Sequence, residues 1–327
     1  MQVLVTGGAG YVGSRVVTHL LSRGYRVRIL DRLLFGADSV TALALNPNCS
    51  IFVGDVRQLK DNAAVMRGVD AVVHLAAVVG EAACNANRRF AWQTNRDAIP
   101  VIMELAAAAG IQRFIFVSTC SNYGVTEPNS IVDENGTLNP LSDYAKAKVE
   151  AERIALDQET TIPVVTILRL GTICGLSHRM RFDLLINEMG RDTVCDREIH
   201  IYAPAAWRPY LHIADAAGAI DCVLAAKPAL VNQRVFNVVG ENHQKTSLLE
   251  MARHLRPNIK VIVTDQSPDL RDYRVSGEYF RRTLNFNPTH GIEDAFREVA
   301  AAVVKGLFPD PYWPGYSAVP IGGFPKD

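Results

Sequence analysis

The chain has 327 residues, of which 48% are hydrophobic and 21% charged, a composition typical of globular proteins. Its length predicts one large α/β unit or a main domain with a smaller one. Lys and Arg together number 34, as do Asp and Glu. The chain therefore carries no net charge that would indicate nucleic acid or a membrane surface as a partner.

Several classes of protein are excluded by features that the sequence lacks. No apolar run is long enough to span a bilayer, and the chain leads directly from Met1 into an expected strand without a signal peptide. We therefore expect a cytoplasmic protein. The six cysteines are scattered without a C-x-x-C pair and are expected to be free thiols. The eight histidines include no H-E-x-x-H motif, so no metal is expected.

The first half of the chain alternates short runs rich in Val and Ile with helical patterns. The runs expected to be buried strands are residues 3–6, 26–31, 51–56, 71–77, 114–119 and 164–170. Helical patterns lie at residues 13–23, 95–109 and 144–157. This alternation predicts an α/β fold with a doubly wound parallel sheet covered by helices on both faces.

The pattern loosens beyond about residue 171, where prolines, aromatic residues and short elements prevail. We expect a dinucleotide-binding domain over residues 1–170 and a smaller substrate domain over most of 171–327. The run NVVG at 237–240 indicates a late strand, so that about 208–240 returns to the first domain. The Pro- and Gly-rich end, 308–327, is expected to be irregular or partly mobile.

Four glycines come after the first expected strand, at positions 7, 8, 10 and 13, and the last three match G-x-G-x-x-G. The absence of side chains permits a sharp turn into a helix and lets backbone N–H groups approach a pyrophosphate. Asp31 lies 18 residues after Gly13, at the end of the second strand, near the spacing expected for a carboxylate that binds ribose hydroxyls. The Asp31 carboxylate favours binding of NAD over NADP, whereas Arg32 leaves binding of NADP open. The other interpretation of Asp31 is a simple turn residue.

Tyr144 and Lys148 stand four residues apart, on one face of an expected helix. A phenol with an ordinary pKa near 10 acts as a base near neutral pH only if nearby positive charge lowers that pKa by about 3 units. The preceding strand ends at Thr119, which puts a hydroxyl at the carboxyl edge of the sheet, where ligands bind in such folds.

These motifs together resemble one family. They are GGAGYVG at 7–13, DV at 55–56, HLAA at 74–77, ST…YG at 118–124 and Y-x-x-x-K at 144–148. The set resembles the extended short-chain dehydrogenase/reductases and, within them, the NAD-dependent nucleotide-sugar epimerases and dehydratases. The likeness continues through RLGTICG (169–175), RPYLHIADAA (208–217), FNVVG (236–240) and DLRDYRVS (269–276), and so covers nearly the whole chain. Within this family, the sequence is similar to the branch of sugar-nucleotide C4 dehydrogenases and epimerases.

The resemblance implies a role for each matching residue. Thr119 would orient the sugar hydroxyl, Tyr144 would be the base, and Lys148 would bind the nicotinamide ribose and tune Tyr144. Cofactor contacts are expected from Gly7, Gly10, Tyr11, Val12, Gly13, Asp31, Asp55, Val56, Leu75, Ala76, Ala77, Asn95, Tyr144 and Lys148. Asn95 has a second interpretation, as a helix N-cap. Substrate contacts are expected from Glu81, Cys120, Ser121, Asn187, Arg208 and Arg271, the last three at the nucleotide diphosphate.

One departure from the family pattern bears on the reaction. Sugar-nucleotide 4,6-dehydratases generally have Asp-Glu directly after the threonine, whereas this chain has Cys120-Ser121. The elimination machinery is therefore expected to be absent. Cys120 is either an acid–base thiol or a packed, inert cysteine, and Glu81 is a second acid–base candidate that is otherwise solvated.

The expected function is NAD-dependent oxidation at C4 of a nucleotide sugar, as a 4-epimerase or a C4 dehydrogenase. A nucleotide-sugar dehydratase, a 4-keto reductase and, in another class, a non-catalytic NAD-binding or redox-sensing protein are the alternatives. A nucleotide-sugar substrate is the expected partner, with neither nucleic acid nor membrane. A homodimer is expected through the alanine-rich helix at 95–110 packed beside helix 144–157.

Overall fold

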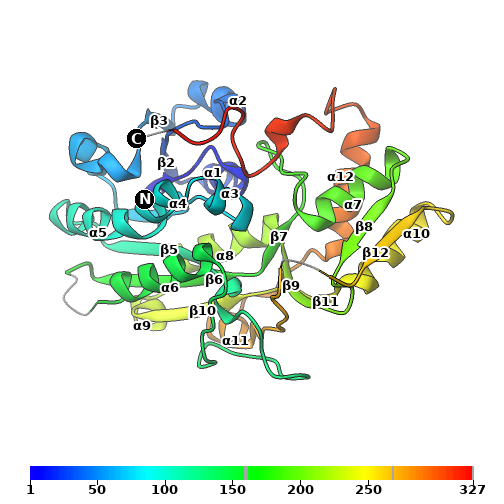
Figure 1. Ribbon diagram of the computed structural model, residues 1–327. Helices are drawn as coiled ribbons and strands as arrows, with labels where there is room; N and C mark the ends of the chain where they lie inside the picture. Colours follow the sequence, from blue (N-terminus) through cyan, green and yellow to red (C-terminus); the bar gives the residue numbers. More distant parts are fainter. Residues whose placement is uncertain (158–160, 267–268, 326–327) are drawn as a thin grey trace.

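A seven-stranded parallel sheet forms the centre of the molecule, in the strand order β10-β6-β5-β4-β1-β2-β3 (Figure 1). This computed structural model describes residues 1–157, 161–266 and 269–325. The strands are β1 (Gln2–Thr6), β2 (Arg26–Asp31), β3 (Cys49–Val53), β4 (Ala71–His74), β5 (Arg113–Thr119), β6 (Val164–Leu170) and β10 (Arg234–Val238). The chain winds outward from β1 in one direction and from β4 in the other, which confirms the doubly wound α/β fold and opens a crevice between their carboxyl ends.

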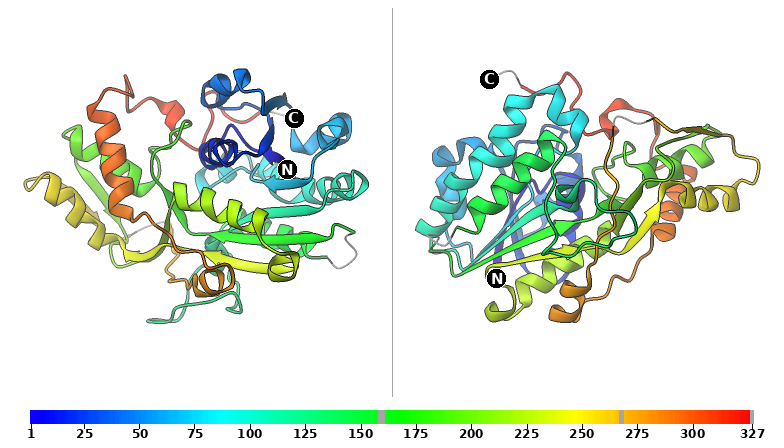
Figure 2. Two further views of the ribbon diagram at one scale, coloured as in Figure 1. Left: turned by 180° about the vertical axis from the view of Figure 1, so that it is seen from behind. Right: turned by 60° about the horizontal axis from the view of Figure 1, so that its bottom comes forward.

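Helices cover both faces of this sheet (Figure 2). One face packs against α1 (Tyr11–Ser22), α8 (Ile213–Ala225), α9 (Pro228–Val231) and α11 (Glu278–Leu284). The other packs against η2 (Val56–Met66), α5 (Ala98–Ala108) and α6 (Asp143–Ala155), of which α5 and α6 lie side by side. Short helices near the sheet edges are α2 (Asp38–Thr41), η1 (Ala42–Leu45), α3 (Glu81–Ala86), α4 (Arg88–Trp92), η3 (Gln93–Asp97) and η4 (Cys120–Tyr123).

A smaller part of the molecule is built from two minor sheets and helices packed on them. One sheet pairs β11 (Glu241–Gln244), β9 (Trp207–His212) and β7 (Thr172–Cys174), and the other pairs β12 (Val261–Thr264) with β8 (Ile199–Tyr202). The accompanying helices are α7 (Leu185–Val194), η5 (Lys245–Leu248), α10 (Leu249–Leu255), α12 (Ile292–Val304) and η6 (Pro314–Tyr316). A separate apolar cluster between β8–β9, α7, α10 and α12 forms its core.

The expected strands are present, but two end earlier than expected. β3 stops at Val53, because the Asp55 side chain accepts the N–H of Arg57 and starts η2. β4 stops at His74, after which the chain passes under the glycine-rich turn. Strand β10 joins the main sheet beside β6 although it comes from the second half of the chain. We keep the boundary at residue 170, with the return of 208–240, as a proposal.

The C-terminal segment after α12 has no regular structure beyond η6 up to residue 325, as expected, and the last two residues lie outside the described part. In Figure 1 it runs from α12 back across the molecule toward α2 and α3. All six cysteines are free thiols, as predicted. Among the described residues, no helix combines the length and the apolar character that a membrane crossing requires.

Candidate active site

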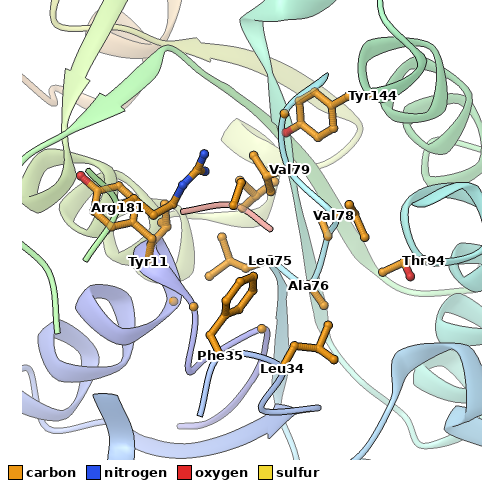
Figure 3. Close-up of a pocket in the computed structure, with 18 of the residues that line it drawn as sticks. Tyr11, Leu34, Phe35, Leu75, Ala76, Val78, Val79, Thr94, Tyr144 and Arg181 are labelled. Carbon is orange, nitrogen blue, oxygen red and sulfur yellow. The ribbon is translucent and has the colours of Figure 1, made fainter. Parts of the chain in front are cut away.

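A cavity of about 370 Å³ lies at the carboxyl edge of the main sheet, where the two parts of the molecule meet. Figure 3 shows Tyr144, Leu75 and Phe35 among the side chains that surround it. It brings together most of the expected site residues: Gly7, Gly10, Tyr11, Val12, Gly13, Asp31, Asp55, Val56, Leu75, Ala76, Ala77, Glu81, Thr119, Ser121, Tyr144, Lys148 and Arg271.

The glycine-rich turn has no room for side chains. A Cβ on Gly13 would lie 2.0 Å from the Gly7 carbonyl oxygen. One on Gly7, whose φ is +72°, would lie 2.7 Å from the Ala76 nitrogen. Helix α1 starts directly afterwards, with Gly10 as an N-cap that has no side chain to offer. The first N–H groups of α1 therefore face the cavity and suit an anionic pyrophosphate, so this turn fits a dinucleotide.

Asp31 is held rigidly at the end of β2. Its carboxylate accepts the N–H of Ala9 at 2.9 Å and that of Leu33 at 2.8 Å, while burial raises the pKa of the carboxyl. Arg32 turns away and donates to Asp55 at 2.6 Å, so its guanidinium is committed to a carboxylate. A fixed Asp31 beside a neutralised Arg32 suits ribose hydroxyls better than a 2′-phosphate.

Thr119, Tyr144 and Lys148 all line the cavity. Burial raises the pKa of Tyr144, and the nearby Arg181 and Arg271 and a hydrogen bond with Thr119 oppose that rise. Burial lowers the pKa of Lys148 to about 8. Its ammonium donates to the Val117 carbonyl at 2.8 Å and is therefore anchored at the end of β5.

Two arginines expected at the diphosphate share one carboxylate. Asp269 accepts from Arg271 at 2.7 Å and from Arg208 at 2.9 Å. Arg271 also donates to the Ser121 hydroxyl at 2.8 Å, which brings its guanidinium to the cavity wall near Thr119. Arg208 stays behind it, 4% exposed and bonded to backbone carbonyls, and does not line the cavity. Arg208 thus supports Arg271 through Asp269, and its own contact with the diphosphate stays a prediction.

Three more expected site residues lie outside the cavity because the fold uses their polar groups elsewhere. Asn95 bonds the backbone of Val78 in both directions, at 2.8 and 2.9 Å, and so fixes the loop after β4; it does not cap α5. The Cys120 thiol is buried and donates to the Arg169 carbonyl, and burial raises its pKa, which favours the packed interpretation over the acid–base one.

Asn187 is the third of these. It is fully buried, accepts the N–H of Gly175 at 2.8 Å and donates to the Tyr11 hydroxyl at 3.0 Å. With both ends of its amide bonded to protein, it is not available to a phosphate. It holds Tyr11, which lines the cavity, against the chain after β7.

Sequence reasoning missed several residues of the cavity wall. They are Leu33 to Gly36, Phe90, Thr94, Arg179, Arg181, Ala318 and Phe324, among others. Arg179 and Arg181 stand in the stretch GLSHRMRFD, where two arginines among apolar residues were the available signal. No local pattern marks Ala318 or Phe324, which reach the cavity from the C-terminal segment.

One group within the described residues brings possible metal ligands together: His212, Asp215 and His290, with ligand atoms within 4.8 Å of one another. Hydrogen bonds already engage these atoms. His212 pairs with Glu298 at 3.1 Å, and Asp215 accepts the N–H groups of Thr289 and His290 at 3.0 and 2.9 Å. The group is explained as a tie between β9, α8 and the loop before α12.

The doubly wound sheet and the glycine-rich turn define a dinucleotide-binding protein of the α/β class, with Thr119, Tyr144 and Lys148 beside the turn in one cavity. The model of the NAD dependent epimerase/dehydratase family matches residues 3–240. The chain belongs to this family, and NAD is its cofactor.

Individual relatives agree with this assignment. The chain is 30% identical over 261 residues to an uncharacterized UDP-glucose epimerase, YtcB, of Bacillus subtilis, covering 77% of this chain and 80% of that protein. It is 26% identical over 326 residues to a UDP-glucose 4-epimerase of Corynebacterium glutamicum, covering 92% and 96%. Its fold matches the crystal structure of a Bacillus cereus UDP-glucuronic acid 4-epimerase in complex with UDP-glucuronic acid and NAD, with a TM-score of 0.84 and 22% identity over 94% of this chain and 100% of that one.

Proposed function

We propose that this protein oxidises the C4 hydroxyl of a nucleotide sugar and acts as a nucleotide-sugar 4-epimerase; a C4 dehydrogenase uses the same first step. The observation that carries the proposal is the meeting of Thr119, Tyr144 and Lys148 with the glycine-rich turn in one cavity. The relative named as a UDP-glucose 4-epimerase supports this reaction, and the relative named as an uncharacterized UDP-glucose epimerase supports epimerisation.

Tyr144 is the proposed base, and its surroundings govern when it can act. Because burial raises the pKa of its phenol, Tyr144 keeps its proton in the free protein. When bound, NAD supplies the hydride acceptor and a positive nicotinamide ring. With a pKa of about 8, Lys148 is mostly protonated at pH 7. Its ammonium stabilises the phenolate, and Thr119 directs the sugar hydroxyl toward Tyr144.

The two residues after Thr119 disfavour an elimination that removes the C6 oxygen. Cys120 is buried behind the cavity wall, and Ser121 is a hydroxyl that already accepts from Arg271. Among the described residues, the carboxylates lining the cavity are Asp31, Asp55 and Glu81, and the first two, which lie at or just after the ends of β2 and β3, are the ones expected at the adenosine. Glu81 is exposed. These residues offer no acid–base pair at the sugar, which favours epimerase or dehydrogenase over dehydratase.

Turnover with UDP-, GDP-, CDP- and dTDP-sugars tests the proposal, with products identified by NMR and reduced cofactor monitored by absorbance. An epimerase yields the C4-inverted sugar without net reduction of NAD, whereas a dehydrogenase releases the 4-keto sugar and accumulates reduced cofactor. A product lacking the C6 oxygen would contradict the proposal, and no turnover across the panel would favour the non-catalytic alternative.

The Tyr144→Phe variant tests the base directly. It keeps the ring packing and removes the hydroxyl, so turnover should fall by about 10²–10⁴-fold while NAD binding changes little. Losing one hydrogen bond with Thr119 alters stability by only about 1 kcal/mol, far less than that loss of activity. Equal rates of NAD reduction in a single turnover by variant and parent would overturn the assignment.

We also propose that the protein is a cytoplasmic homodimer. The argument for assembly is the pair α5 and α6, which lie side by side (Figure 2) and leave the aliphatic residues Val101, Leu105 and Ile154 partly accessible. The free thiols support a reducing compartment. Light scattering at micromolar concentration should give twice the chain mass, and a monomer there would contradict the proposal.

A further inference from the structure

Arg179 reaches the cofactor end of the cavity from the smaller part of the molecule. It lies between β7 and α7, lines the cavity and is only 8% exposed. Ser177, two residues earlier, anchors this segment to the start of α1 by donating to the Tyr11 carbonyl at 2.6 Å. The Ser177 hydroxyl is also 3.0 Å from that of Ser14. The segment is thus fixed beside the turn that suits a pyrophosphate.

The guanidinium of Arg179 is buried and has no carboxylate in direct contact among the described residues. It stacks on Phe35, with 3.8 Å from the guanidinium carbon to the ring centroid, and one terminal nitrogen donates to the Ser317 carbonyl. Its Nε is buried and has no hydrogen-bond partner within the described part of the chain. No ion pair of Arg179 with a carboxylate occurs there either, whereas Arg181 is paired twice with Asp183, at 2.9 and 2.8 Å.

A buried cation of this kind calls for a counter-charge. Burial, with Arg181 close by, lowers the pKa of Arg179 to about 10, which expresses the cost of keeping it charged. Asp183 and Asp31 attract it, but Asp183 is already paired with Arg181, and neither carboxylate forms an ion pair with Arg179 within the described residues. A pyrophosphate in front of the glycine-rich turn would supply the missing charge and an acceptor for Nε.

The C-terminal segment holds Arg179 from the other side. Besides the Ser317 carbonyl, Tyr316 accepts the N–H of Phe182 at 2.9 Å and Ala318 donates to Asp183 at 3.0 Å. Farther on, Phe324 packs on Phe90 of α4, with 5.4 Å between ring centroids.

The same segment continues to the cavity wall and the first sheet. The Pro325 carbonyl accepts from Asn87 at 3.2 Å, and both Ala318 and Phe324 line the cavity. Residues 316–325 therefore bridge the Arg179 segment and α4 along the wall, as the path of the red segment in Figure 1 illustrates.

We propose that Arg179 binds the pyrophosphate of NAD, and that residues 316–325 form a strap that keeps Arg179 in place and retains the bound cofactor. The substrate is also a diphosphate, but Asp31, Phe35 and Tyr11 around Arg179 belong to the cofactor end of the cavity. The proposal concerns cofactor binding alone, so it stands or falls independently of which sugar is turned over.

Calorimetry on the full-length Arg179→Met variant, without sugar nucleotide, is the test. NAD and ADP-ribose, which share the pyrophosphate, should both bind at least about tenfold more weakly, because a charge-assisted contact is lost. Arg179→Lys keeps the positive charge and should recover part of the affinity for NAD, although a lysine stacks less well on Phe35 than an arginine does. The control Arg297→Met removes an arginine whose side chain is 73% exposed on α12, and should bind NAD as the parent does.

Other outcomes overturn the assignment. Unchanged NAD affinity in both Arg179 variants refutes it. A loss seen for UDP but not for NAD assigns Arg179 to the diphosphate of the substrate, and a loss confined to NADP assigns it to a 2′-phosphate. Thermal unfolding without ligand verifies that the variants are folded; should Arg179→Met be unfolded, the lysine variant decides.

The strap is tested separately by the rate at which reduced cofactor dissociates, measured by its fluorescence. Phe324→Ala removes the contact with Phe90 and should raise this rate at least about fivefold, a change of roughly 1 kcal/mol. Ile321→Ala, in the same segment but 62% exposed, is the matched control and should match the parent. Equal rates in the two variants would refute the strap.

Discussion

His74 makes this protein sensitive to acid at its active-site edge. The imidazole ends β4, is fully buried, and stacks on Phe116 at 5.8 Å, and the Lys148 ammonium lies 4.5 Å from the centroid of the same phenyl ring. Its Nδ1 is 2.8 Å from the Thr6 hydroxyl, and its Nε2 has no partner among the described residues. Burial, aided by Lys148, lowers the pKa of His74 from 6.5 to about 3.

The lowered pKa sets both the sign and the size of the effect. Below pH 6.5 the unfolded chain takes up a proton that the folded chain refuses, so stability is lost as the pH falls from 6.5 toward 3. Between pH 7 and pH 5 the loss from this single group is about 2 kcal/mol, a large part of a typical folding free energy of 5–15 kcal/mol.

Urea unfolding of the parent and of His74→Gln at pH 7 and pH 5 measures this contribution. The drop in free energy of unfolding should be about 2 kcal/mol smaller in the variant, because its side chain does not titrate. His254→Gln, which removes an exposed histidine, should show the drop of the parent. NMR of the parent imidazole, neutral at pH 5, gives a second readout. Equal drops in His74→Gln and parent, or a charged His74 ring at pH 5, would refute the reasoning.

Three further predictions concern the cofactor site and the core of the protein. Gly13→Ala should abolish measurable NAD binding in calorimetry, because the new Cβ would lie 2.0 Å from the Gly7 carbonyl oxygen; affinity within threefold of the parent contradicts this. In calorimetry, NAD should bind more tightly than NADP, and the Asp31→Ala substitution should make the two affinities more similar. Tighter binding of NADP by the parent protein counts against the role of Asp31. Glu152→Gln should lower the free energy of unfolding by about 3–5 kcal/mol, because it weakens a buried 2.7 Å ion pair with Arg169; a loss below 1 kcal/mol in urea unfolding argues against that pair.

Local patterns in the sequence predict those features of this protein that depend on residues close together along the chain. Glycines at 7, 10 and 13 predict a strand–helix turn because the backbone there leaves no room for a Cβ, a property visible within seven residues. The spacing of Tyr144 and Lys148 is also a local signal, because residues four apart lie on the same side of a helix, here α6. The alternation of apolar runs and helical stretches likewise predicts the parallel sheet, because burial on both faces leaves its mark on each strand.

Tertiary structure decided which polar side chains are left over for a ligand. Asn187 and Cys120 are expected at the substrate, yet their polar atoms bond backbone groups 12 and 49 residues away, and neither residue lines the cavity. Arg179 is the opposite case, since its significance depends on a carbonyl 138 residues later and on the absence of a carboxylate partner among the described residues. Hydrogen bonding and burial are settled by contacts between distant segments, so a one-dimensional pattern names the candidate residues while the folded chain determines which of them face the cofactor.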